Sequence, residues 1–174
     1  MKLQRSLGGA VAGSLAAAVW AAQQPLDKRV FECDYDDVEM LGKLVTRGRE
    51  WPLVGLAIHM GNGAAFGAIY SQLRPFVPGP PVATGLLAGL VEHASSWPFV
   101  GLVDQRHPAR RDIPTLWGNR RALAQATWRH ALFGAVLGAL EALVNDRSAD
   151  EPPTIPFSSN GHGSLETAVT VSEA

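Results

Sequence analysis

Four ionisable side chains lie in stretches that otherwise hold almost only apolar and small residues: Glu92, His93, His59 and His130. A carboxyl group and imidazoles can exchange protons near neutral pH, so these residues could carry a proton- or cation-linked pathway. Imidazoles also bind metals and haem, so a site at His59, His93 and His130 is a second hypothesis. The simplest hypothesis is structural, in which Glu92 pairs with Arg129 or with a histidine and holds helix register.

The motifs of the chain argue against an enzyme. It has no Gly-x-Ser-x-Gly elbow, no P-loop and no glycine fingerprint for a dinucleotide. The histidines show neither Glu-x-x-His nor His-x-x-x-His spacing, so nothing specific supports the metal or haem hypothesis and no cofactor is predicted. The single cysteine, Cys33, excludes an internal disulfide framework.

Four apolar segments must position these side chains: 6–26, 51–73, 82–103 and 122–145. At about 1.5 Å per residue, a helix over 51–73 would be about 34 Å long, enough to cross a hydrocarbon layer of about 30 Å. The charged residues concentrate in the loops, whereas a soluble helical domain carries charges along every helix. We therefore predict an all-α fold, a polytopic membrane bundle of about four transmembrane helices.

Parts of this prediction have alternatives. Segment 6–26 could be a signal peptide, because Ala21 is a small residue at a suitable cleavage position. Segment 122–145 is strongly apolar only over 131–140. It is predicted as a helix, and whether this helix crosses the membrane completely stays open. A soluble bundle packed through Gly and Ala is the alternative fold. Residues 36–47 should form an amphipathic helix at the interface, and the polar stretch 146–174 should be a disordered tail.

Each apolar segment contains two glycines four residues apart: Gly9 and Gly13, Gly63 and Gly67, Gly85 and Gly89, Gly134 and Gly138. Small residues at this spacing let two membrane helices approach closely. On a helix, the glycine stripes also hold His59, Glu92 and His130. The polar side chains should therefore point between helices, where Arg129 and Gln125 could join them.

Aromatic and basic residues predict the topology. Trp20, Trp51, Trp97 and Trp128 should form a belt on one side of an up-and-down bundle. The loops 27–50 and 104–121 lie on that side and hold ten of the fifteen Lys and Arg residues, so we predict both to be cytoplasmic. The expected partners are the lipid bilayer and, at the basic loop 104–121, anionic headgroups. Nucleic-acid binding is not expected, and a homo-oligomer stays open.

The overall pattern resembles that of small polytopic proteins of the bacterial inner membrane. The residues that carry this resemblance are Gln23-Gln24-Pro25-Leu26-Asp27, the His-x-x-Asn sequence at 59–62, and the stretch from Gln125 to His130, set among glycine-rich helices. The resemblance implies a multi-pass protein of the plasma membrane. It implies no substrate and no activity.

Overall fold

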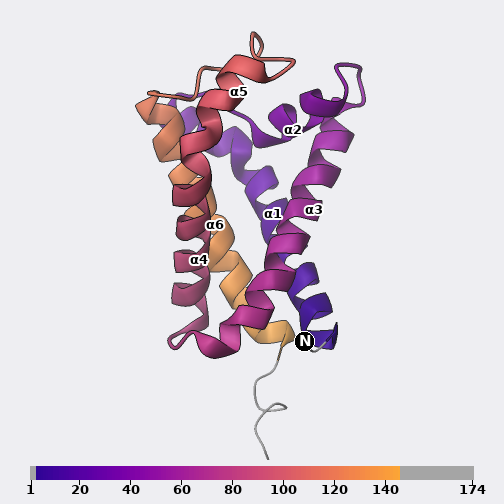
Figure 1. Ribbon diagram of the computed structural model, residues 1–174, viewed down its shortest axis with the longest axis vertical. Helices are drawn as coiled ribbons and strands as arrows, with labels where there is room; N and C mark the ends of the chain where they lie inside the picture. Colours follow the sequence, from indigo (N-terminus) through magenta and orange to yellow (C-terminus); the bar gives the residue numbers. More distant parts are fainter. Residues whose placement is uncertain (1–2, 146–174) are drawn as a thin grey trace, which may run out of the picture.

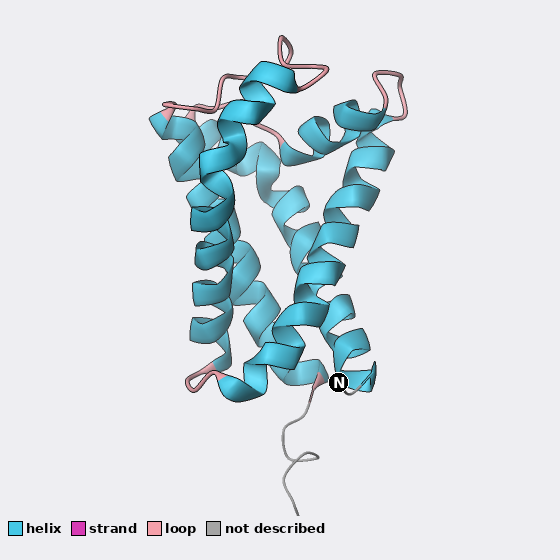
Figure 2. Cartoon of the chain, in the orientation of Figure 1, coloured by secondary structure: helices cyan, strands magenta, loops and turns pink. Residues whose placement is uncertain are grey.

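The computed structural model describes residues 3–145, and within this range all regular secondary structure is helical, which confirms the predicted all-α class (Figures 1 and 2). The predicted disordered tail, 146–174, lies outside the described residues. The helices are α1 (Leu3–Phe31), α2 (Asp37–Val45), α3 (Trp51–Leu73), α4 (Pro81–Ser96), α5 (Val100–Arg106) and α6 (Arg120–Val144), with the 3-10 turns η1 (Arg74–Phe76) and η2 (Trp97–Phe99).

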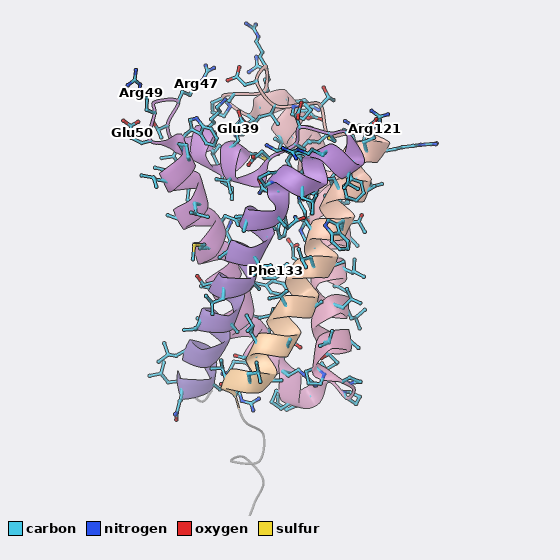
Figure 3. The ribbon with its side chains drawn as sticks, turned by 180° about the vertical axis from the view of Figure 1, so that it is seen from behind. Glu39, Arg47, Arg49, Glu50, Arg121 and Phe133 are labelled. Atoms are coloured by element: carbon cyan, nitrogen blue, oxygen red, sulfur yellow. The ribbon has the colours of Figure 1, made fainter. Side chains whose placement is uncertain are left out.

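The long helices run up and down and form two closely packed pairs. In Figure 1, α1 and α3 cross each other, and α4 lies along α6. The contact between α1 and α6 joins the two pairs, whereas α3 and α4 make few contacts with each other. The short helices α2 and α5 lie at the end of the bundle that carries the long connections. Charged residues labelled in Figure 3, among them Arg47, Glu50 and Arg121, gather at this same end.

Proline divides the third apolar segment, which we had predicted as one helix over 82–103. The α-helix α4 ends at Ser96, and the turn η2 carries Pro98 before α5 begins. Proline supplies no backbone N–H and its ring collides with the carbonyl four residues earlier, so an α-helix is interrupted there. Conversely, α1 extends to Phe31 although Pro25 lies inside it. This extension keeps Asp27 on a helix, where sequence analysis had placed the start of a loop.

The predicted interfacial helix corresponds to the shorter α2. Asp36 caps its N-terminus, and its side chain accepts a hydrogen bond from the Glu39 backbone N–H at 2.9 Å. The first helical residue, Asp37, is buried. The helix is thus tied to the bundle through its first turn.

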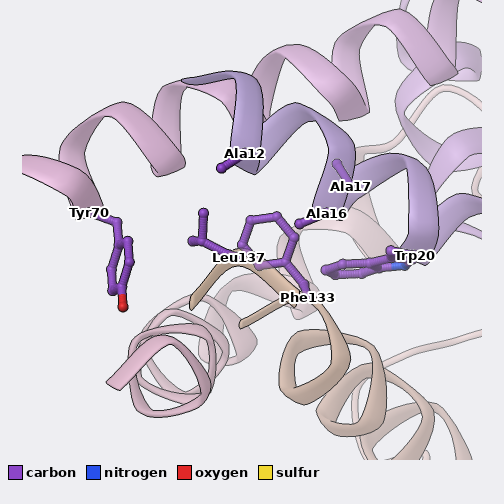
Figure 4. Close-up of a cluster of buried hydrophobic side chains, with 7 residues drawn as sticks. All are labelled: Ala12, Ala16, Ala17, Trp20, Tyr70, Phe133 and Leu137. Atoms are coloured by element: carbon purple, nitrogen blue, oxygen red, sulfur yellow. The ribbon is translucent and has the colours of Figure 1, made fainter. Parts of the chain in front are cut away.

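A small apolar core fills the space between α1 and α6. Figure 4 shows Phe133 and Leu137 of α6 facing Ala12, Ala16 and Trp20 of α1. Only 6% of Trp20 is exposed, so this tryptophan lies in the core and not in the predicted surface belt. Its indole N–H donates to Asp37 at 3.2 Å, so the polar end of this buried tryptophan has a hydrogen-bond partner.

Glycines bring the backbones within each helix pair very close together. A Cβ atom built on Gly13 would lie less than 3.0 Å from the Gly63 carbonyl oxygen across the α1–α3 contact. Likewise, a Cβ atom on Gly85 would lie less than 3.0 Å from the Gly134 carbonyl oxygen across the α4–α6 contact. Even alanine is too large at these positions without a backbone shift.

Gly63→Ala should therefore destabilise the protein by about 1–3 kcal/mol, the usual cost of overpacking. Gly61 of the same helix is a matched control, because a Cβ atom there would meet no other atom within 4 Å. Gly61→Ala should be neutral or stabilising by up to about 1 kcal/mol, the difference in helix propensity. Chemical unfolding in detergent, followed by circular dichroism, measures both. Equal effects at the two positions would contradict the close approach of α1 and α3.

The outer surface of the helices is rich in large apolar side chains. On α1, five of them recur every four residues and are 42–74% exposed: Leu3, Leu7, Val11, Leu15 and Val19. Leu53 and Ile69 of α3 and Leu87 and Val91 of α4 are also exposed. Among the described helices, two stretches are long and apolar enough to cross a membrane, Trp51–Phe76 and Pro81–Arg106.

Candidate functional site

A cavity of about 340 Å³ lies between α3 and α4, the two long helices that make few mutual contacts. Residues of α1 and α6 form its back wall, and residues of α2 and α5 line the end near the long loops. Much of the wall is aromatic, contributed by Trp20, Phe66, Trp97, Phe99 and Phe133. Five titratable side chains with carboxyl or imidazole groups also line it: Asp37, His59, Glu92, His93 and His130.

Glu92 and His130 form a hydrogen-bonded pair in this cavity. His130 Nε2 lies 2.7 Å from Glu92 Oε2, and His130 Nδ1 lies 2.8 Å from the Ala126 carbonyl oxygen. A carbonyl oxygen only accepts, so Nδ1 carries a proton and donates it. One further proton is needed between Nε2 and Oε2, either on the imidazole or on the carboxyl group. The pair therefore holds an exchangeable proton, and the Glu92 side chain is 39% exposed.

His93 packs against this pair and is hydrogen-bonded to Thr127. Its ring centroid lies 4.7 Å from that of His130. Thr127 donates its hydroxyl proton to the Leu123 carbonyl oxygen at 2.7 Å, so His93 Nε2 must donate to Thr127 Oγ1 at 2.9 Å. His93 Nδ1 is buried without a hydrogen-bond partner among the described residues.

His59 reaches the same cavity from α3. Its ring lies against the indole of Trp20, with ring centroids 4.9 Å apart. The ring centroids of Trp20 and His130 lie 4.7 Å apart. His59 is only 7% exposed, and its Nε2 has no hydrogen-bond partner within residues 3–145. Buried polar atoms without hydrogen-bond partners are uncommon in proteins. The unpartnered nitrogens of His59 and His93 therefore make this cavity a candidate binding site.

Behind the cavity, Arg129 forms a fully buried ion-pair network. Its guanidinium binds Asp27 in a bidentate manner, with Nε–Oδ2 and Nη2–Oδ1 distances of 2.6 Å. A third bond of 2.6 Å joins Nη1 to Asp37 Oδ2. The planar guanidinium matches two carboxylates in this geometry, and no part of the Arg129 side chain is exposed. Arg129 thus joins α6 to both α1 and α2.

Neutral donors complete the network. Gln125 donates to Asp27 Oδ1 at 2.7 Å and to the Cys33 carbonyl oxygen at 3.0 Å. Burial raises the pKa of Tyr35, so its hydroxyl stays protonated and donates to Asp37 at 2.5 Å. Burial alone would raise the pKa of Asp37 as well, but the Arg129 guanidinium and the Tyr35 hydroxyl outweigh it and hold that pKa below its usual range.

The structure divides the residues singled out in the sequence into two groups. Glu92, His93 and His130 lie together, and Glu92 binds His130 rather than Arg129. Arg129 and Gln125 bind the carboxylates Asp27 and Asp37, which sequence analysis had assigned to a loop and to an interfacial helix. One signal could have pointed to these partners. An arginine inside an apolar helix requires a carboxylate, and the nearest acidic residues of the preceding loops are candidates.

The histidines do not form a metal centre in the described residues. Within residues 3–145, no three His, Cys, Asp or Glu side chains lie close enough together to hold a metal ion. His93 and His130 are adjacent, but both His130 nitrogens are engaged by Glu92 and Ala126.

The comparisons with known proteins give no family. Neither the protein-family models, nor the curated proteins, nor the solved structures contain a match to this chain.

Proposed function

We propose that this protein is a multi-pass membrane protein that binds a small, largely apolar molecule in the cavity between α3 and α4. In this proposal the membrane is crossed four times, by α1, by α3, by α4 with α5, and by α6. The apolar side chains exposed around the helices support this, as do the buried polar ones such as Arg129, Gln125 and His59. An exterior rich in large apolar side chains, with several polar side chains buried inside, suits lipid surroundings better than water.

The cavity is the single observation that carries the binding function. Its volume of about 340 Å³ lies in the range of small-molecule sites, and such sites combine apolar walls with a few polar groups. Because α3 and α4 pack little against each other, a lipid-soluble molecule could enter between them. The Arg129 network serves the structure, since it fastens α1, α2 and α6 behind the cavity.

The proposed location is the bacterial inner membrane, with the long loops in the cytoplasm. Basic residues mark the loop end of the bundle, among them Arg47, Arg49 and Arg121 (Figure 3). Cytoplasmic loops of membrane proteins carry such an excess of Lys and Arg. Anionic headgroups would contact the loop 104–121, which contains Arg106, Arg110 and Arg111.

Membrane integration has a direct test. After expression in bacteria, the protein should sediment with the membranes, resist extraction at alkaline pH and dissolve only in detergent. Recovery of folded protein in the soluble fraction without detergent would contradict the four-span arrangement.

Binding is tested with two probes of one shape, the cation benzyltrimethylammonium and its neutral analogue neopentylbenzene. Protein in phosphatidylcholine nanodiscs should bind them saturably relative to empty nanodiscs. Ser96 lines the cavity, so Ser96→Trp should weaken binding by at least about tenfold by filling it. The neighbouring Ser95 is exposed and does not line the cavity, so Ser95→Trp should leave binding unchanged. The proposed function fails if neither probe binds saturably, or if both variants act alike.

A further inference from the structure

We infer that the ligand of this cavity is a small organic cation, and that its charge replaces the proton held between Glu92 and His130. This inference rests on the proposed function, because it names the chemical class of the molecule bound in the same cavity.

The charges around the cavity favour a cation. One guanidinium, that of Arg129, is shared by Asp27 and Asp37, and Glu92 adds a third carboxylate. No Lys or Arg side chain lines the cavity. The buried carboxylates Asp27 and Asp37 need positive charge close by, and one guanidinium balances only one of them. The proton of the Glu92–His130 pair supplies one such charge, and a bound cation can supply it instead.

The walls favour an organic cation over a hydrated metal ion. Trp20, Phe66, Trp97, Phe99 and Phe133 offer aromatic rings, whose faces attract organic cations. Small inorganic cations require several oxygen ligands in place of their water, and this wall provides few. A molecule with a cationic centre and an apolar body would place its charge by Glu92 and its body against the rings.

The hydrogen bonds of His130 define which proton is exchanged. Nδ1 donates to the Ala126 carbonyl oxygen and is fixed, so the labile proton is the one between Nε2 and Glu92 Oε2. When a cation binds next to Glu92, this proton leaves to water, which conserves the charge of the site. The other charged or titratable groups around the pair come from α2, α3, α4, α6 and the α1–α2 loop: Asp37, His59, His93, Arg129 and Tyr35.

The experiment uses the intact protein in phosphatidylcholine nanodiscs and the same two probes. Neither probe carries an acidic proton, so any proton released must come from the protein. Benzyltrimethylammonium should bind at least about tenfold more tightly than neopentylbenzene. Binding of the cation should release close to one proton in a weakly buffered solution. The affinity of the protein for the cation should fall on acidification, approaching about tenfold per pH unit, because protons and the cation compete for the same site.

Glu92→Gln removes the carboxylate and should reduce the ratio of the two affinities towards one. Glu92→Asp retains the charge and should preserve most of the preference for the cation. If Glu92→Gln does not fold, the affinity ratio and the proton release of the unmodified protein decide the matter. His130→Gln, which keeps Glu92, should lower the proton release while the cation still binds.

The outcomes separate the two proposals. If both probes bind with equal affinity, the cation inference is overturned and the proposed function stands. If neither binds, the proposed function fails and the inference falls with it. A preference for the cation without proton release, or one that survives Glu92→Gln, also overturns the inference, because Glu92 would then not be the group that exchanges the proton.

Discussion

Arg129→Leu should lower the free energy of unfolding by about 3–5 kcal/mol, the cost of removing one partner from a buried ion pair. Arg129 is the only guanidinium bonded to Asp27 and Asp37 in the described chain, and all three side chains are buried. Without it, two neighbouring carboxylates would lie in the bundle with neutral donors only. Reversible unfolding in mixed detergent micelles, followed by circular dichroism, gives the magnitude.

Two further variants show whether charge is the cause. In the triple variant Arg129→Leu, Asp27→Asn, Asp37→Asn, much of the lost stability should return, because no carboxylate is left uncompensated. Arg121→Leu removes another ion pair, with Glu32, in which the side chains are 64% and 70% exposed. That change should cost less than about 1 kcal/mol. A triple variant as unstable as Arg129→Leu alone would show that the guanidinium acts mainly through packing.

Asp37→Ala should have the second largest effect, about 3 kcal/mol, and should loosen α2 in particular. Asp37 accepts hydrogen bonds from Arg129, Trp20 and Tyr35, which tie the start of α2 to the bundle. Hydrogen exchange should accelerate over Asp37–Val45 more than over α6. Glu39→Ala is the matched control in the same helix, because the Glu39–Lys43 pair is partly exposed, lies outside the Arg129 network and should contribute less than about 1 kcal/mol.

The contribution of Asp37 should also depend on pH. Its pKa in the folded protein is lowered, since Arg129 and Tyr35 outweigh the effect of burial. A carboxyl group whose pKa is lower in the folded than in the unfolded protein stabilises the fold above the unfolded-state pKa of about 4. This stabilisation is lost as the pH falls through the folded-state pKa. The unmodified protein should therefore lose more stability than Asp37→Asn as the pH falls below about 4. Parallel acid titrations of the two proteins would contradict this assignment.

The apolar segments and their glycine spacing predicted the four long helices approximately, but not the extension of α1 to Phe31 or the break at η2. They define which residues share one helix face, and so they placed His59, Glu92 and His130 towards neighbouring helices. They do not define which helices become neighbours. Glycine pairs occur on all four long helices, and nothing in their spacing distinguishes the observed pairs, α1 with α3 and α4 with α6, from other pairings.

The partners of Arg129 were missed for a related physical reason. A salt bridge between residues 102 positions apart leaves no local pattern in a single sequence. Asp27 follows Pro25 and precedes two basic residues, a context that usually belongs to a loop. Its place on a continuing helix depends on α6, whose Arg129 and Gln125 bind its carboxylate. These tertiary contacts stabilise the part of α1 that follows Pro25.

The same separation has a consequence for biosynthesis. Asp27 emerges from the ribosome 102 residues before Arg129, a delay of about 5–20 s at the usual rate of bacterial and eukaryotic translation. During that interval its carboxylate has no guanidinium partner, and the same holds for most of that time for the carboxylate of Asp37. Synthesis of α6 then supplies the guanidinium, so the side-chain contacts at the end of α1 form only after α6 has been made.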